Sequence, residues 1–204
     1  NMNEIIRIDA EATQIALSKL YGDNSYSVDA IGEGAWSYAY IFEHTGSKKV
    51  IRWGDVRDNF ERDHFAAQYS SEDLPIPQIL EMGEFNGKYF AISPFVSGNF
   101  LEQITQDELF KTTPSILHML RKLRTTEITQ SKGYGFFDKD GIGSHQSWKE
   151  FLLDDKNESK GSLIHGWKEN LKSSEMGSGS YDLIWDKFCS LIEYCPEDRK
   201  LVHS

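Results

Sequence analysis

The stretch "YSVDAIGEGAWSYAYIFEHTGSKKVIRWGD" (residues 26–55) decides the fold, because it holds three strand-like runs separated by glycine-containing turns. The turns fall at residues 32–34 and 45–47. β-branched and aromatic residues fill the runs, as is typical of half-buried strands. The stretch therefore predicts an antiparallel meander.

The flanking segments extend this sheet. Upstream, a helix is expected to begin after the cap residue Asp9 and to stop at Gly22. Downstream, residues 57–71 predict a second helix. Residues 74–95 then predict two strands joined by a hairpin turn at Asn86-Gly87. Residues 23–95 thus predict five strands with one inserted helix.

After Gly98 the pattern becomes helical. Thr113-Pro114 has the cap and first-turn proline that start a helix over residues 113–126. Further helices are expected at residues 148–153, 162–172 and 181–194. The predicted fold class is α+β, with two lobes. Residues 1–95 form a sheet lobe, and residues 96–204 form a hinge and the first part of a mainly helical lobe.

Composition narrows the classes of function. The 204 residues carry a formal net charge of −10, which disfavours a nucleic-acid-binding surface and is compatible with a cationic ligand. No apolar run approaches the roughly 18 residues that span a membrane. The first residues lack the pattern of a signal peptide, and the two cysteines match no metal or redox motif. We expect a cytoplasmic protein with reduced thiols. The six histidines show no metal-binding spacing, so no metal site is expected within the chain.

The first glycine turn is a candidate phosphate-binding loop. Gly32 and Gly34 flank one residue, and Ser37 stands where a third glycine often occurs. Without Cβ atoms in the way, backbone N–H groups of such a turn can approach an anion closely. No Walker-type phosphate loop occurs in the sequence.

A cation follows on the third strand of the meander. Arg52 shares a strand face with Val50, and a cation there reaches phosphate oxygens held by a preceding glycine loop. The next helix offers Glu61 and Asp63. These residues are two apart and lie on different helix faces, so at most one of them points back at Arg52.

The segment "YFAISPFVSG" (residues 89–98) connects the lobes. Its backbone offers an acceptor at the Ser93 C=O and a donor at the Phe95 N–H. This two-residue spacing suits the amino group and ring nitrogen of adenine.

The glycine turn, the cation, the acidic helix and the lobe connection follow one another in the order seen in the small lobe of a protein-kinase-like fold. The chain also resembles the aminoglycoside phosphotransferases, and among them the branch that acts on hygromycin B. The resemblance covers most of the chain. The stretches that carry it are "LPIPQILEMGEF" (74–85), "AISPFVSG" (91–98), "GYGFFDKDGIGSHQSWKEF" (133–151) and "CPEDRKLVHS" (195–204).

The resemblance implies transfer of the γ-phosphoryl group of ATP or GTP, with Mg²⁺, to a hydroxyl of a cationic aminocyclitol antibiotic, which inactivates the drug. Arg52 would replace the usual lysine, oriented by Asp63, which is preferred, or by Glu61. The remaining nucleotide contacts would come from Gly32, Gly34, Ser37, Ser93 and Phe95. Trp148, Asp154 and Asp155 would line the antibiotic site; the alternatives are a packing role for Trp148 and a solvated helix end for the aspartates.

The resemblance also bears on "LVHS" (201–204), which in the family runs straight into the catalytic aspartate. His203 would belong to the catalytic loop, and the base would follow Ser204, with the metal ligands beyond it. The chain is therefore expected to be truncated, and inactive without the rest of a monomeric parent enzyme. Two alternatives stay open: a non-catalytic nucleotide-binding module, or a kinase of choline, homoserine or fructosamine type.

Overall fold

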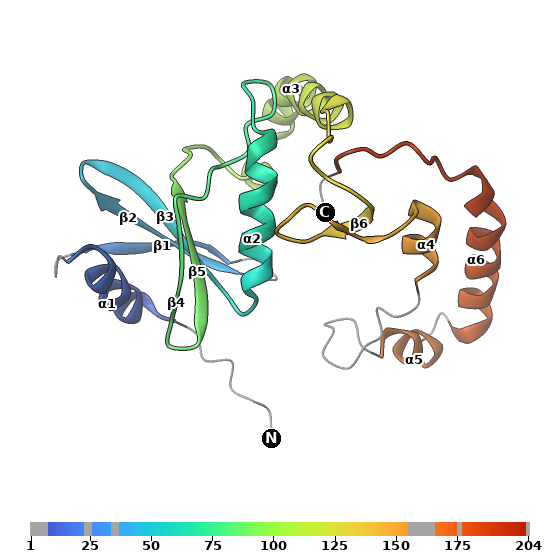
Figure 1. The fold of residues 1–204 in the computed structure, drawn as a ribbon, viewed down its shortest axis with the longest axis horizontal. Helices are drawn as coiled ribbons and strands as arrows, with labels where there is room; N and C mark the ends of the chain where they lie inside the picture. Colours follow the sequence, from blue (N-terminus) through green and yellow to red (C-terminus); the bar gives the residue numbers. More distant parts are fainter. Residues whose placement is uncertain (1–7, 23–25, 34–36, 155–165, 175–176, 203–204) are drawn as a thin grey trace. The chain divides into compact units, whose positions relative to one another are not determined.

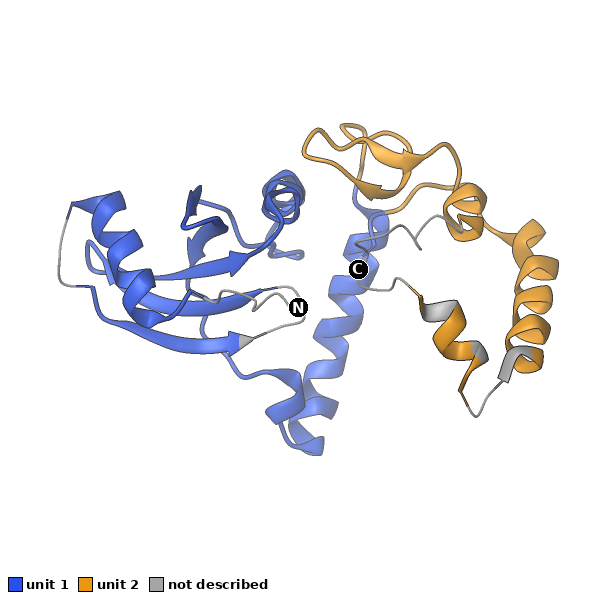
Figure 2. Ribbon diagram, turned by 90° about the horizontal axis from the view of Figure 1, so that it is seen from below, with its two compact units in different colours: residues 1–126, 201–204 blue, residues 127–200 orange. Residues whose placement is uncertain are grey.

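The computed structural model describes residues 8–22, 26–33, 37–154, 166–174 and 177–202. The chain forms two compact units (Figure 2). Unit 1 comprises residues 1–126 and 201–204, and unit 2 comprises residues 127–200. Packing thus divides the chain after Thr126, whereas the sequence predicts a functional boundary after Phe95. That functional boundary stays a prediction.

Unit 1 is an antiparallel sheet with helices (Figure 1). The strand order is β1-β2-β3-β5-β4, so the predicted five strands with one inserted helix are confirmed. Its elements are α1 (Ala10–Tyr21), β1 (Val28–Glu33), β2 (Tyr38–His44), β3 (Ser47–Gly54), α2 (Arg57–Ala66), the 3₁₀ turn η1 (Ala67–Tyr69), β4 (Glu81–Phe85), β5 (Lys88–Pro94), η2 (Leu101–Gln103) and α3 (Gln106–Thr125).

The hairpin between β4 and β5 forms as predicted. Asn86 and Gly87 have φ angles of 51° and 74°. Positive φ at both central residues is the geometry of a type I′ turn, whose twist matches that of the flanking strands. The turn sets the register in which Phe85 lies opposite Lys88.

One face of the sheet is closed by α1. Asp9 caps this helix by accepting from the Ala12 N–H at 2.8 Å, as the sequence predicts. Leu17 of α1 and Trp53 of β3 are fully buried there, and the indole Nε1 of Trp53 donates to Thr13 Oγ1 at 3.1 Å. The core on this face comprises Ile8, Ala16, Leu17, Tyr26, Tyr40, Phe42, Ile51, Trp53, Phe90 and Ile92.

The other face of the sheet carries α2. Phe60 is the buried residue of this helix, and it packs with Ile79 and Ala91 in a much smaller apolar cluster. In the view of Figure 1, α1 and α2 lie on opposite sides of the strands. Alternate residues of each strand therefore face two different environments.

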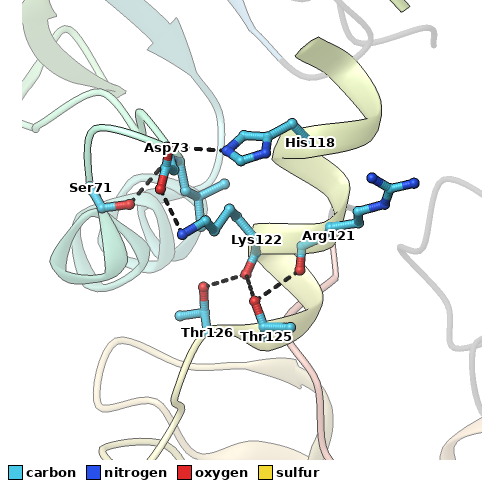
Figure 3. A network of polar contacts seen from close by, with 8 residues as sticks. Ser71, Asp73, His118, Arg121, Lys122, Thr125 and Thr126 are labelled. Carbon is cyan, nitrogen blue, oxygen red and sulfur yellow. Dashed lines mark hydrogen bonds and ion pairs between the residues drawn. The ribbon is translucent and has the colours of Figure 1, made fainter. Parts of the chain in front are cut away.

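The long helix α3 corrects the prediction of a helix over residues 113–126. It begins at Gln106, because Thr105 and Glu108 form a capping box, and Pro114 lies inside the helix rather than in its first turn. The helix is tied to the loop after η1 through Asp73 (Figure 3). The carboxylate of Asp73 binds Lys122 Nζ at 2.6 Å and His118 Nε2 at 3.0 Å.

Unit 2 contains a two-stranded sheet and short helices. The helix predicted at residues 148–153 is confirmed, whereas the last long helix begins at Gly177 instead of residue 181. The pairing of β6 with β7 was not predicted. The elements are β6 (Tyr134–Phe137), β7 (Gly143–His145), α4 (Trp148–Leu153), α5 (Trp167–Lys172), α6 (Gly177–Leu191) and η4 (Ile192–Tyr194). Among the described residues of both units, no helix combines the length and apolarity needed to cross a membrane.

Candidate functional site

A row of cross-strand neighbours brings the glycine turn and the cation onto one face of the sheet in unit 1. Adjacent strands lie about 4.8 Å apart, so the first and third members of the row are about 10 Å apart along the sheet. The alanines on either side of the arginine leave space around its long side chain. In order across β1, β2, β3, β5 and β4, the row is Gly32, Ala39, Arg52, Ala91 and Met82.

Arg52 is held in place by α2. Its Nη2 donates to Asp63 Oδ2 at 2.7 Å, and its guanidinium lies 5.5 Å from the centroid of the buried Phe60 ring. The Arg52 side chain nevertheless keeps 32% of its surface exposed. A guanidinium has five N–H donors, and the contact with Asp63 uses one of them. The arrangement orients a cation while leaving it accessible to an anionic ligand.

The alternative partner, Glu61, lies elsewhere. Its carboxylate accepts from Arg57 Nε at 2.7 Å, one helical turn away along α2. This hydrogen bond raises the pKa of Arg57. Of Glu61 and Asp63, Asp63 is therefore the one that contacts Arg52.

The glycine turn is only partly described. Among the described residues, a Cβ built at Gly32 meets only the Phe100 ring within 4 Å, at 3.9 Å, so they leave the backbone at Gly32 approachable. Gly34 lies outside the described residues, and Ser37 is half-buried immediately before β2. The exposed Phe100, which the sequence did not single out, is brought to this turn from beyond the lobe connection.

The two backbone groups expected to hold adenine are not both free. The Phe95 N–H donates to the Lys48 C=O at 3.1 Å, which extends the β3–β5 pairing past Pro94. Ser93 is buried and lies opposite Val50. The expectation that the Phe95 N–H is available as a donor is therefore corrected, since the sheet already uses that donor.

The candidate antibiotic-site residues of unit 2 have partners within that unit. The Trp148 ring stacks on Phe151 with centroids 5.0 Å apart. Asp154 Oδ2 accepts from His145 Nε2 at 2.8 Å, and both side chains are largely buried. Nδ1 of the same ring lies within hydrogen-bond distance of the Ser144 hydroxyl, at 2.7 Å.

These contacts bear on the roles that the sequence left open for unit 2. Trp148 has a packing partner in Phe151, and Asp154 has a hydrogen-bond partner in His145. His145 was missed, because its partner is nine residues away along the chain. Asp155 lies outside the described residues, as does His203.

A metal site is not assembled in the part of the chain that the structure describes. No group of three histidine, cysteine or acidic side chains lies close enough together there to hold a metal ion. What the described residues do offer is an oriented cation beside an approachable backbone turn. This combination can bind and position a phosphorylated ligand.

Known proteins are similar to this chain both in sequence and in fold. The chain is 27% identical over 178 residues to hygromycin-B 4-O-kinase from Escherichia coli, an alignment that covers 85% of this chain and 50% of that enzyme. The chain thus spans about half the length of this curated relative. No model of a known protein family matches it.

Solved structures agree with this comparison. A thermostable mutant of aminoglycoside phosphotransferase APH(4)-Ia, crystallised with AMP-PNP and hygromycin B, superposes with a TM-score of 0.80 at 26% identity. That match covers 94% of this chain and 63% of the other. The crystal structure of APH(4)-Ia itself gives a TM-score of 0.80 at 25% identity, over 94% of this chain and 64% of that one. By sequence and by fold, the chain is similar to the aminoglycoside phosphotransferases, and among them to hygromycin B kinase.

Proposed function

We propose that the protein is an ATP-dependent phosphotransferase that phosphorylates a hydroxyl of an aminocyclitol antibiotic of the hygromycin B type. The proposal concerns the full-length protein. It places the reaction in the cytoplasm, where the nucleotide is abundant. The product is a phosphorylated antibiotic, so the biological role is resistance to that drug.

The observation that supports this most directly is the Arg52–Asp63 pair on the open face of the sheet. The ion pair orients the guanidinium, and the row of small neighbours leads from it to Gly32. Phosphoryl transfer depends on positioning and on electrostatic stabilisation rather than on covalent chemistry by the protein. An oriented cation two strands from a glycine turn supplies both for the phosphates of ATP.

The roles follow from the chemistry of each group. Arg52 binds phosphate oxygens, Asp63 holds Arg52, and backbone N–H groups of the turn at Gly32 contact the phosphates. The segment after β5 receives the adenine ring. Mg²⁺ would neutralise charge on the phosphates. The net charge of −10 favours the approach of a polycationic antibiotic.

The test is a phosphorylation assay with the full-length protein, ATP and Mg²⁺. Hygromycin B is expected to gain one phosphoryl group, seen by mass spectrometry, with one ADP released per antibiotic modified. Replacing ATP by GTP measures nucleotide preference. Choline, homoserine and a fructosamine, tested in the same assay, report on the other acceptor classes of this fold.

The outcomes separate the alternatives. Turnover of hygromycin B that is lost in Arg52→Ala and kept in Arg57→Ala supports the proposal. Turnover of one of the other acceptors alone would keep the kinase and change its substrate. Nucleotide binding by calorimetry, without turnover of any acceptor, would instead establish a non-catalytic module.

A further inference from the structure

Phe100 is an exposed aromatic residue that the fold of unit 1 brings to the start of the glycine turn. It lies between β5 and η2, and 55% of its surface is exposed. A single exposed phenylalanine needs no explanation by itself. Its place relative to the proposed phosphate-binding groups, Gly32 and Arg52, therefore decides whether it has a role.

The Phe100 ring lies on the same face of the sheet as Arg52. A register shift in β1 places Gly32 opposite Ala39, whereas unshifted pairing would place Gly32 opposite Tyr38 and turn it to the other face. Ala39 in turn lies opposite Arg52, and residues directly opposite each other share a face. A Cβ built at Gly32 therefore points to the Arg52 face, and it meets the Phe100 ring at 3.9 Å.

An apolar ring and an oriented cation thus stand at two ends of one short row. Gly32, which the ring contacts, is two strands from Arg52, or about 10 Å along the sheet. Between them lies the half-buried Ala39, whose methyl group leaves the surface low. This arrangement is complementary to a ligand with a flat apolar end and an anionic end. A nucleoside triphosphate has both.

The segment that carries Phe100 is anchored by backbone hydrogen bonds on both sides. Before it, the Phe95 N–H donates to the Lys48 C=O at 3.1 Å. After it, the Gln103 N–H donates to the Phe100 C=O at 2.9 Å, as η2 begins. The first of these bonds also occupies a donor that a base would otherwise use, so a bound base needs another contact.

We propose that the Phe100 ring is the surface on which the base of the bound nucleotide stacks. This rests on the nucleotide-binding part of the proposed function, in which Arg52 and the glycine turn hold the phosphates. Stacking on an aromatic ring needs no free hydrogen-bond donor, because every base has a π-face. Phe100 therefore contributes affinity for the nucleoside end of ATP and none for its phosphates.

The experiment measures the binding of ATP and of inorganic tripolyphosphate, each with Mg²⁺, to the full-length protein by calorimetry. Tripolyphosphate has the anionic end of the nucleotide without the sugar and the base. Phe100→Ala is expected to raise the Kd for ATP about 10-fold and to leave the Kd for tripolyphosphate unchanged. Arg52→Ala should weaken the binding of both ligands, because it removes the cation.

Two further substitutions at the same position test whether the ring itself matters. Phe100→Tyr keeps the aromatic face and should bind ATP as the wild type does. Phe100→Leu keeps apolar bulk without the ring, so its affinity for ATP should fall close to that of Phe100→Ala. Phe110→Ala is the matched control, because Phe110 on α3 is a phenylalanine that is 69% exposed. It should bind both ligands with wild-type affinity.

Three results would overturn the inference. The first is an unchanged affinity for ATP in Phe100→Ala. The second is an equal loss of affinity for ATP and tripolyphosphate, which would mean that Phe100 supports the glycine turn instead. The third is wild-type affinity for ATP in Phe100→Leu.

Failure of the proposed function has a different signature. Wild-type protein that binds ATP but phosphorylates no acceptor would count against the proposed function and leave the stacking role of Phe100 standing. Wild-type protein that binds no ATP would overturn both.

Discussion

The two faces of the five-stranded sheet are built by the same strands but differ in burial and in the residues they carry. On the α1 face, large apolar side chains such as Trp53, Ile51 and Ile92 are fully buried. On the α2 face, the neighbouring strand positions hold the half-buried Arg52 and Val50, with small residues on either side of Arg52. Burial of the α1 face supplies stability, and the α2 face, called the open face here, keeps part of the Arg52 side chain accessible.

This difference shows that a small sheet can carry its core on one face and its ligand-binding side chains on the other. Successive residues of a strand alternate between the faces. Trp53 and Arg52 are therefore adjacent in the chain, but Trp53 belongs to the core and Arg52 to the proposed phosphate site. Substitutions on the closed face should therefore change the free energy of unfolding. Substitutions on the open face should change activity.

The largest effect is expected for Trp53→Ala on the closed face. Removing a fully buried indole leaves a cavity and deprives Thr13 Oγ1 of its donor, which costs about 4 kcal/mol of unfolding free energy. Urea denaturation of the full-length protein measures this. Leu183→Ala, at a position in unit 2 that is 72% exposed, is the control and should change stability little. Equal losses in both variants would break the distinction between buried and exposed positions.

Arg52→Ala should be the largest change on the open face. It removes a preorganised cation from the proposed phosphate site, so kcat/KM for phosphorylation should fall by about 100-fold. The midpoint of urea unfolding should shift little. Arg57→Ala is the matched control, because Arg57 forms the same kind of ion pair with Glu61 on the same helix. A loss of activity in Arg57→Ala as great as in Arg52→Ala would remove the special role of Arg52.

Asp63 and Glu61 of α2 allow a finer test. Asp63→Asn weakens the bond that orients Arg52, and a charge-assisted bond of about 1.5 kcal/mol corresponds to about 10-fold in rate. Glu61→Gln should leave the rate within about 2-fold, since Glu61 contacts Arg57 instead. Steady-state kinetics on both variants measure which substitution lowers the rate more. The reverse ranking would mean that Arg52 changes its partner when nucleotide binds.

The smallest effect is expected away from both faces, at Asp73. The hydrogen bond from Lys122, and then that from His118, hold the pKa of Asp73 below its ordinary value of 3.8. A depressed folded-state pKa stabilises the fold above about pH 4, and this contribution disappears as the pH falls through the lower value.

Asp73→Asn should therefore lower the Tm slightly at neutral pH and match the wild type in strong acid. Circular dichroism melts across pH measure this, with the exposed neighbour Glu72→Gln as control. A difference between wild type and Asp73→Asn that grows as the pH falls would contradict the assignment.

Much of unit 1 could be predicted from local signals. The glycine-containing turns, the alternating runs and the Asp9 cap each act over a few residues, so the five strands and the first helix follow from neighbours in the chain. The helix α3 was misplaced because Thr113-Pro114 resembles a start, while the capping box at Thr105 and Glu108 lies a full two turns earlier. The β6–β7 pair was missed because it lacks a regular alternation.

The sequence by itself determined which residue types are available: a glycine turn, a cation on the third strand, and the carboxylates of Glu61 and Asp63 on the helix after it. Only the tertiary structure decided that Asp63 pairs with Arg52, that the sheet uses the Phe95 N–H, and that the Phe100 ring lies against Gly32. The reason is physical. Local backbone preferences act between near neighbours, whereas an ion pair or a contact between a ring and a turn depends on distances set by the packing of elements far apart in the chain.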